Sequence, residues 1–278
     1  MLLPIHVGAL ISDTTLPMQR DDDVAGKPCC NISAKNKNYC ELTALYWAWK
    51  NIKTLYPDIE YVGLCHYRRY FDFDEPAFTF GEETFKPVCE VTSYKVDKKK
   101  LERILQNYSI IIRKRKFLQH SVQTAYNGGH VSGDMRTLIK VISELHPEYL
   151  QSVIDVWLCG NKFTGGNLAI MRWDLFESYC EWLFSLLSEC EKRIDISTYS
   201  AGQARIFGYM GERLLDVWVD HQEKHGQKVK CLDSVKYCDE KTFRPHISWE
   251  IRKRLAYWLI TPHRKSTKQA KLKEILRS

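Results

Sequence analysis

Residues 61–71 read YVGLCHYRRYF, and this stretch decides how the fold is interpreted. It opens with a short apolar run, Val62 to Cys65, that is typical of a buried β-strand. A strand that only builds a core usually ends in Gly, Asn, Asp or Pro. This one continues instead into His66, Tyr67, Arg68 and Arg69. Because ligands of open α/β sheets bind at the carboxyl ends of strands, and Arg suits phosphate, the stretch predicts an anion-binding site. A structural role for the same side chains, in salt bridges and a satisfied core hydrogen bond, is the alternative.

Apolar runs and helical periodicities alternate along the rest of the chain. Strands are expected at 5–11, 61–65, 108–118, 167–171 and 227–235, and helices at 31–51, 98–106, 134–145, 147–158, 172–192 and 199–222. Alternating strands and helices are typical of α/β proteins. The sequence therefore predicts an α/β fold with a Rossmann-type, mainly parallel sheet flanked by helices.

Composition narrows the class of protein. The chain has 278 residues, of which 44% are hydrophobic, which is enough for one large or two small domains. No run of about 18 apolar residues is present, and the first residues lack the features of a signal peptide. Most of the ten cysteines stand in apolar segments and no CxxC occurs, so we expect reduced thiols and a cytoplasmic location.

The net charge of +7 is concentrated at the end of the chain. Residues 250–278 hold nine Lys or Arg and two Glu, while the remainder is neutral. We therefore divide the chain into a domain, 1–248, and a basic helical tail, 249–278. One helical face of the tail carries Ile251, Leu255, Trp258 and Leu259, a pattern that lies on anionic membranes. The alternative is a helix packed on the body, followed by a disordered basic end.

Polar residues crowd the start of the helix expected at 31–51. They are Asn31, Ser33, Lys35, Asn36, Tyr39 and Glu41. A helix N-terminus offers free N–H groups and a positive dipole end, so it can bind an anion. The alternative is a capped, solvated helix start whose apolar residues enter the core.

Carboxylates after the strand at 61–71 raise the question of a metal. Asp72 and Asp74 form an Asp-x-Asp triplet, which could hold Mn²⁺ or Mg²⁺ through oxygen ligands. The residues 21–23, three consecutive Asp, are a similar candidate. Exposed carboxylates near arginines are the alternative for the first triplet.

Two further segments carry polar groups in otherwise apolar or glycine-rich surroundings. His130 and Asp134 stand in a glycine-rich stretch that is either an acceptor-binding loop or a turn with a helix cap. Arg205, Glu212 and Arg213 lie on an apolar helix, where the last two are either a catalytic or diphosphate-orienting pair or a buried ion pair. The absence of GxGxxG, Walker, HExxH and GxSxG motifs disfavours dehydrogenases, ATPases, zinc proteases and α/β-hydrolases.

The strings NISAKNKNYCELTALYWAWKN, YVGLCHYRRYF, GGNLAIMRWDLFESYCEWLF with EKRIDIS, and QARIFGYMGERLLDVWV resemble one family. It is the bacterial capsular-polysaccharide glycosyltransferase family catalogued as domain of unknown function 4422, and the likeness covers roughly residues 5–235. The resemblance implies a GT-A-type fold, a nucleotide-diphosphate sugar donor and a glycan or undecaprenyl-diphosphate-linked acceptor. Galactofuranosyl transfer in some members makes UDP-galactofuranose the first donor to consider, ahead of other UDP-hexoses.

The resemblance also assigns residues. The family's donor-binding blocks match Asn31, Ser33, Lys35, Asn36, Tyr39, Glu41, Tyr67, Arg68, Arg69, Asn167, Arg205 and Arg213. Glu212, Asp134 and His66 are the candidate bases, and His130 is the candidate acceptor contact. Arg68 or Arg69, with Lys35, is expected to take the diphosphate charge, with or without a metal at Asp72 and Asp74.

Three differences from the family pattern define an alternative function. Family members start with a longer strand before IHVGAL, the segment GKPCC replaces a tight Asp-rich turn, and TGGNLAIM replaces a more usual string. We therefore also consider a degenerate protein that binds a glycan or nucleotide without turnover. A nucleic-acid-binding protein is disfavoured, because the body of the chain is neutral.

Overall fold

A computed structural model of the chain describes residues 1–73, 83–239, 251–255 and 268–277. Its central element is a four-stranded sheet whose strands lie in the order β12, β8, β11 and β5. The strands are β5 (Tyr61–Leu64), β8 (Ile110–Arg113), β11 (Ala169–Arg172) and β12 (Val229–Leu232). The three isoleucines of β8 are fully buried, as expected of a strand covered on both faces.

The strands of this sheet do not all run in the same direction. β12 runs parallel to β8, but β11 runs antiparallel to both β8 and β5. The α/β class is thus confirmed: β5, β8 and β12 all run in one direction, as expected of a mainly parallel sheet, and β11 is the strand that runs against them. Apolar runs identify strands, but the connections between them decide their direction, and periodicity does not encode those connections.

Shorter strands extend this framework. β6 (Arg69–Phe71), β13 (Ser234–Tyr237) and β7 (Glu83–Lys86) form a second sheet in the order β6, β13, β7. Three two-stranded pairs join β1 (Ile5–His6) to β2 (Gln19–Arg20), β3 (Asp23–Val24) to β4 (Lys27–Pro28), and β9 (Lys116–Phe117) to β10 (Lys162–Phe163). The strand expected at 5–11 is therefore shorter, because Gly8 turns the chain at a φ of 67° into a 3₁₀ turn.

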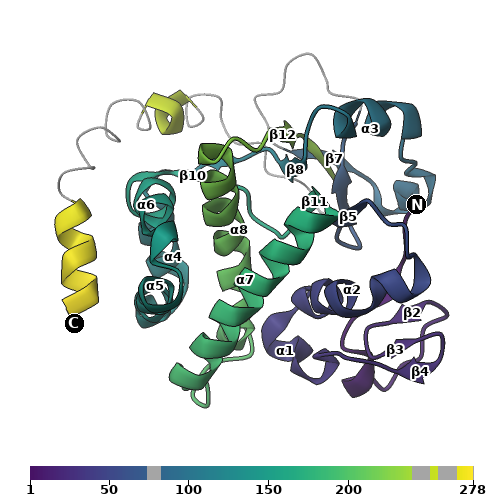
Figure 1. Ribbon diagram of the computed structural model, residues 1–278, viewed down its shortest axis with the longest axis horizontal. Helices are drawn as coiled ribbons and strands as arrows, with labels where there is room; N and C mark the ends of the chain where they lie inside the picture. Colours follow the sequence, from purple (N-terminus) through teal and green to yellow (C-terminus); the bar gives the residue numbers. More distant parts are fainter. Residues whose placement is uncertain (74–82, 240–250, 256–267, 278) are drawn as a thin grey trace.

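The helices pack beside the sheets. They are α1 (Asn36–Tyr39), α2 (Leu42–Leu55), α3 (Lys98–Leu105), α4 (Val122–Gly129), α5 (Ser132–Leu145), α6 (Leu150–Val153), α7 (Trp173–Arg193) and α8 (Ile206–Lys224). Figure 1 shows α8 between the long α7 and the stack of α4, α5 and α6, with α1 and α2 on the other side of α7. The expected helix at 147–158 is instead a 3₁₀ turn, α6 and a π-helical segment.

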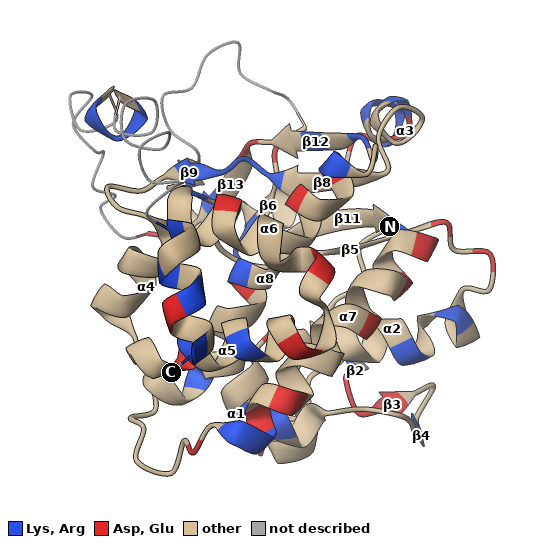
Figure 2. Ribbon diagram, turned by 60° about the vertical axis from the view of Figure 1, so that its left-hand side comes forward, with Lys and Arg blue, Asp and Glu red and all other residues tan. Residues whose placement is uncertain are grey.

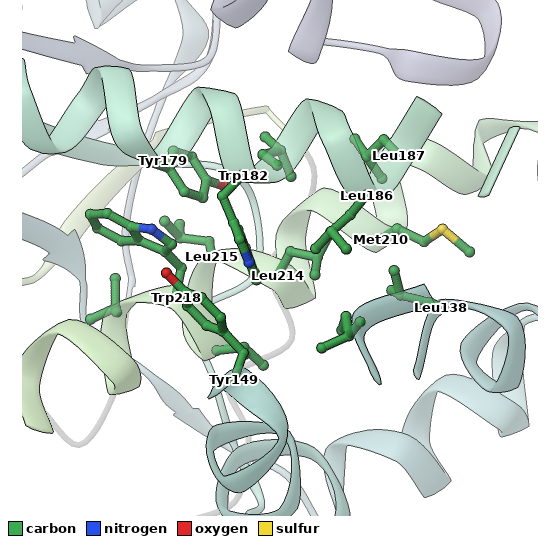
Figure 3. Packing of buried hydrophobic residues seen from close by; sticks show 14 of the residues in the cluster. Leu138, Tyr149, Tyr179, Trp182, Leu186, Leu187, Met210, Leu214, Leu215 and Trp218 are labelled. Atoms are coloured by element: carbon green, nitrogen blue, oxygen red, sulfur yellow. The ribbon is translucent and has the colours of Figure 1, made fainter. Parts of the chain in front are cut away.

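The main core lies where α7 and α8 meet their neighbours. Buried residues of α7 recur three or four positions apart, so one face of that helix turns inward. Figure 3 shows Trp182 and Leu186 of α7 meeting Leu214 and Trp218 of α8, with Tyr149 closing the cluster from below. This packing fixes α8, which carries several of the residues discussed below.

The C-terminal residues are described in two pieces. Residues 251–255 and 268–277 are helical. Leu272 and Ile275 are buried in the main core cluster, so the last helix packs on the body. Figure 1 shows this helix alongside the stack of α4, α5 and α6. Trp258 and Leu259, which the sequence places on the amphipathic face, lie outside the described residues.

Candidate functional site

The stretch after β5 folds into a tight hairpin. The backbones of His66 and Arg69 exchange two hydrogen bonds, with N···O distances of 3.1 and 3.2 Å. Tyr67 and Arg68 therefore form the tip of the turn, where the guanidinium of Arg68 lies 4.8 Å from the centre of the exposed Tyr67 ring. At the base of the hairpin, Arg69 is the first residue of β6 and His66 pairs with it as an isolated antiparallel bridge. The two adjacent arginines thus have different surroundings.

Glu41 reaches this hairpin from the start of α2. The helix expected at 31–51 is interrupted at Cys40, whose φ of 53° is unusual for a residue with a side chain. The interruption separates α1 from α2 and leaves Glu41 at the first turn of α2. Its carboxylate lies 3.7 Å from Nε2 of His66 and accepts a hydrogen bond of 2.7 Å from Nδ2 of Asn167.

A glycine pair brings the loop before β11 against the same hairpin. Gly165 and Gly166 have φ values of 63° and 73°, a conformation that favours glycine. A Cβ atom placed on Gly166 would lie 3.5 Å from Nη1 of Arg69 and 3.6 Å from Cε1 of His66. The backbone angle is what requires glycine at position 166, while the two distances show that the side chains of Arg69 and His66 lie directly against it.

Hydrogen bonds to Asp216 and Arg113 hold this loop in place. Asp216 of α8 accepts hydrogen bonds from the backbone N–H and the hydroxyl of Thr164, at 2.8 and 2.5 Å. The same carboxylate accepts a bond of 2.9 Å from Nε of Arg115. Arg113, at the end of β8, donates to the carbonyl of Gly165 at 3.1 Å. The loop is thus fixed at Thr164 and at the carbonyl of Gly165, directly before Gly166.

Glu212 is the carboxylate that α8 contributes. It accepts a hydrogen bond from the backbone N–H of Gly166 and pairs with Arg213 at 3.2 Å. Burial raises the pKa of Glu212 above its ordinary value, and the nearby charge of Glu41 raises it further. Arg213, the N–H of Gly166 and Arg69 act in the opposite direction. Glu212 is therefore a carboxylate with a raised pKa that pairs with Arg213 and is also influenced by the charge of Arg69.

These contacts define a candidate site around Gly166. It consists of Glu41, His66, Arg69, Gly166, Asn167 and Glu212, from α2, the hairpin, the loop before β11, and α8. The arrangement combines a guanidinium that can neutralise an anion with a carboxylate that can accept a proton. Transfer of a group away from an anionic leaving group requires both features.

Arg213 connects this site to a second group of polar residues. Its guanidinium lies between the rings of Tyr126 and Phe163, at 4.9 and 4.7 Å from their centres. The ring of His130 lies 4.6 Å from that of Tyr126 and 4.2 Å from that of Tyr209 on α8. Burial, followed by the charge of Arg213, lowers the pKa of His130.

Asp134 stands on the far side of Tyr126. It accepts hydrogen bonds from the hydroxyls of Tyr199 at 2.7 Å and Tyr126 at 3.4 Å. The residue is almost fully buried, and burial raises the pKa of its carboxyl despite these two bonds. The carboxylate therefore orients the tyrosines that surround Arg213 and His130.

Several residues of the block 31–41 have structural partners. Asn31 accepts a bond from the N–H of Ser33, and the hydroxyl of Ser33 donates to the buried Asp21 at 2.5 Å. Asp21 also accepts the N–H groups of the turn at Gly8 and Ala9, so it organises the N-terminal segment. Asn36 donates to the carbonyl of Cys40 at 2.8 Å.

Lys35 and Tyr39 meet on another carboxylate. The ammonium of Lys35 lies 2.7 Å from Glu191 of α7, and the hydroxyl of Tyr39 donates to the same oxygen at 3.1 Å. A diphosphate contact by Lys35 would have to compete with this ion pair. Within this block, the geometry thus joins Glu41 to the candidate site and gives Lys35 a different partner.

Arg205 is the N-cap residue of α8, one helical turn before Tyr209 and two turns before Glu212. Its Nε donates to the sulfur of Cys40 at 3.2 Å, next to Glu41. Burial raises the pKa of the Cys40 thiol, and Arg205 opposes that change. Arg205 therefore borders the site at the junction of α1, α2 and α8.

The two carboxylates predicted to bind a metal, Asp72 and Asp74, follow strand β6. Asp72 is half-buried, and its N–H donates to the carbonyl of Asp233, while Asp74 lies outside the described residues. Within the ranges that the structure describes, no cluster of three or more His, Cys, Asp or Glu side chains could hold a metal ion. The described residues alone do not form a metal centre, and a Mn²⁺ or Mg²⁺ site stays a prediction.

Sequence reasoning missed the residues that hold the site together. Asp216 follows Glu212 by four positions on α8, and a carboxylate in the apolar run of that helix was a usable signal. Arg113 ends the apolar run of β8 and is also buried. Their partners, Thr164 and Gly165, are about 50 residues away in the chain, so periodicity could not identify the contacts.

Comparisons with known proteins agree with this architecture. Residues 1–224 match the model of a family described as Domain of unknown function (DUF4422). A solved apo structure of the bifunctional glycosyltransferase WbbM is similar to the chain, with a TM-score of 0.72 and 28% sequence identity. The match covers 87% of this chain but only 44% of that one. No curated protein matches. The expected GT-A-like fold is therefore confirmed.

Proposed function

We propose, from the premise that the chain belongs to the DUF4422 family, that it is a glycosyltransferase with a nucleotide-diphosphate sugar as its donor. The acceptor is a glycan or a lipid-linked oligosaccharide of the capsule, O-antigen or exopolysaccharide type. The observation that carries the proposal is the meeting of Arg69, His66, Glu41 and Glu212 around Gly166, in a fold shared with a glycosyltransferase.

The chemistry assigns separate roles to Arg69 and Glu212. In the net transfer, the acceptor oxygen bonds to the anomeric carbon, and the bond from that carbon to the diphosphate breaks. The nucleoside diphosphate leaves with the electron pair, and Arg69 stabilises its charge. Glu212 takes the proton of the acceptor hydroxyl, which its raised pKa favours.

Of the other candidate bases, Asp134 already accepts two tyrosine hydroxyls, and His66 lies beside Glu41. We therefore place Glu212 first. His130, stacked on Tyr209 along the same helix, is the proposed acceptor contact. UDP-galactofuranose, or another UDP-hexose, is the donor to test first. Mn²⁺ or Mg²⁺ is a further variable, and no step of this scheme depends on it.

The setting proposed for this reaction is the cytoplasmic face of a membrane that carries the acceptor. Over the residues that can be described, no helix is both long and apolar enough to cross a bilayer. Contact through residues 251–255, which combine three basic side chains with two apolar ones, is the proposed means of attachment.

A thermal-shift panel tests the donor site. UDP, GDP, CDP and TDP would each be added to the full chain, with and without Mn²⁺. A nucleotide at roughly 100 times its dissociation constant stabilises the fold by about 2.7 kcal/mol. The nucleotide with the correct nucleobase should therefore raise the unfolding temperature by several degrees. The panel also reports whether the metal contributes.

Two neighbouring arginines provide a matched pair of variants. Arg69→Ala should weaken binding of the stabilising nucleotide by roughly tenfold or more, because a charge-assisted bond to phosphate is lost. Arg68→Ala, at the tip of the hairpin, should weaken it less. Unchanged affinity in Arg69→Ala would remove its diphosphate role. If no nucleotide stabilises the wild-type chain, a non-catalytic glycan-binding protein becomes the better interpretation.

A further inference from the structure

The last helix encloses a cavity against the body of the protein. The cavity has a volume of about 200 Å³ and lies between residues 268–277 and the two helices α4 and α5. It is lined by Gln123, Asn127, Ser132, Arg136, Lys271, Glu274 and Ile275, of which all but Ile275 have polar side chains. Leu272 and Ile275, both buried, hold the last helix in this position. The cavity is therefore formed by two parts of the chain that are far apart in sequence.

One polar group in the lining lacks a partner. Gln123 is only 5% exposed, and its Oε1 accepts no hydrogen bond from any described residue. A buried amide oxygen without a donor is unfavourable, because it has lost its hydrogen bonds to water. Asn127 stands one helical turn further along α4 and also lines the cavity. The two amides thus present a hydrogen-bonding surface that suits hydroxyl groups.

Positive charge faces the same space. Arg136 on α5 and Lys271 on the last helix both line the cavity, and among the described residues that line it Glu274 alone is a carboxylate. Among the described residues, neither cation forms an ion pair within 4.0 Å. Ser132, the first residue of α5, adds the positive end of a 14-residue helix. The cavity therefore has an excess of groups that attract an anion.

We propose that this cavity is a binding site for a small anionic sugar, meaning a monosaccharide that carries one phosphate or carboxylate. The hydroxyl groups of such a ligand would donate to Oε1 of Gln123 and contact Asn127. Its acidic group would lie between Arg136 and Lys271. The volume falls below the roughly 300–1,000 Å³ of pockets that hold drug-sized ligands, which favours a monosaccharide over a nucleotide sugar.

This site is distinct from the one around Gly166. None of its lining residues belongs to the candidate catalytic group, and the last helix lies beyond residues 1–224, which match the family. However, His130 directly follows α4 and Asp134 lies on α5, and both contact Tyr126, whose ring lies against Arg213. A ligand in the cavity would contact both the last helix and these two helices, and would therefore stabilise their association.

Titration calorimetry on the full chain tests the proposal. The probes are glucose 6-phosphate, glucuronate, neutral glucose and inorganic phosphate. We expect at least one of the two anionic sugars to bind at least tenfold more tightly than glucose and phosphate, and the better of the two identifies the acidic group. Hydrogen exchange of residues 268–277 should slow when that sugar is present, because the ligand contacts this helix directly.

Two lysines on the same helix supply the matched variants. Lys271→Ala should weaken binding of the anionic sugar at least fivefold, and Arg136→Ala should do the same. Lys273→Ala removes an equivalent exposed charge that does not line the cavity, and should leave the affinity unchanged. Absence of binding by both anionic sugars, or equal losses in Lys271→Ala and Lys273→Ala, would overturn the proposal. Nucleotide-induced stabilisation should be unchanged in Lys271→Ala, so the two proposed sites can fail independently.

Discussion

The carboxylate of Glu212 occupies surroundings that favour its protonated form. Burial raises its pKa above the ordinary value of a glutamate, and the charge of Glu41 adds to that effect. A base works best when its pKa approaches the operating pH, because it is then both deprotonated and ready to accept a proton. At the residue scale, this is the property that separates Glu212 from the exposed carboxylates of the same helix.

The role of Glu212 predicts a specific pH dependence. The base must be ionised, so turnover should fall as the pH drops through its raised pKa, and the acid limb should lie above pH 4.5. Glu212→Gln should lower turnover by roughly 10²–10⁴-fold and remove that limb. The control is Glu223→Gln, which replaces an exposed carboxylate near the end of α8. It should retain both the turnover and the acid limb. Initial rates from pH 4 to 9 on a UDP-sugar donor would measure this, roughly spanning the range in which Glu and His titrate. An unchanged acid limb in Glu212→Gln would assign the base elsewhere.

The sequence could identify some of these residues but not their partners. The abrupt change from an apolar run to His66 and Arg69 marks a site, because core strands rarely end in this way. Whether Arg68 or Arg69 faces the site depends on the turn, which places Arg68 at the tip through hydrogen bonds between His66 and Arg69. Such a one-residue register is not encoded in composition or periodicity.

At the scale of elements, Asp216 joins α8 to the loop that carries Gly166. Asp216→Asn should destabilise the fold by roughly 3–5 kcal/mol, because one partner of a buried charged network is removed while Arg115 remains. Asp220→Asn, on the same helix, removes only an exposed pair with Lys224 and should cost less than about 1 kcal/mol. Urea denaturation of both variants would measure the difference. Equal losses would mean that the loop does not depend on Asp216.

The positions of the helices were predicted better than the breaks between helices and the directions of the strands. The apolar periodicities at 98–106, 134–145 and 172–192 correspond to α3, α5 and α7 within a few residues. By contrast, the break at Cys40 and the antiparallel direction of β11 come from tertiary contacts. Cys40 packs against Gly208 of α8, where a Cβ atom would lie 3.0 Å from its sulfur. Tertiary packing therefore sets the position of Glu41, and local helical propensity would have continued the helix through it.

At the scale of the whole molecule, the basic end of the chain has two different surroundings. The helix at 268–277 packs on α4 and α5, which matches the alternative of a tail packed on the body. Residues 251–255 instead lie against β9 and β10, with Arg254 5.1 Å from the Phe117 ring and the carbonyl of Lys253 bonded to Asn161. Figure 2 shows basic residues on β9 as well as on this short helix.

These surroundings confine the proposed membrane contact to one face. Ile251 and Leu255 are 47% and 52% exposed, one helical turn apart, beside Arg252, Lys253 and Arg254. Each basic residue near an anionic surface contributes about 1 kcal/mol, and salt weakens that attraction. We expect the chain to float with vesicles containing phosphatidylglycerol but not with phosphatidylcholine alone, and less so as salt is raised.

Variants of the exposed apolar residues show whether the membrane contact is made by this face or by the tail as a whole. Replacing Ile251 and Leu255 with Ser should abolish flotation, because the apolar pair would no longer enter the interface. Leu276→Ser changes an exposed leucine on the packed helix and should have no effect. Nucleotide-induced stabilisation should survive in both variants, since neither touches the site around Gly166. Flotation that persists in the double variant would place the membrane contact on another surface. Binding to neutral vesicles would exclude the charge attraction on which this orientation of the molecule depends.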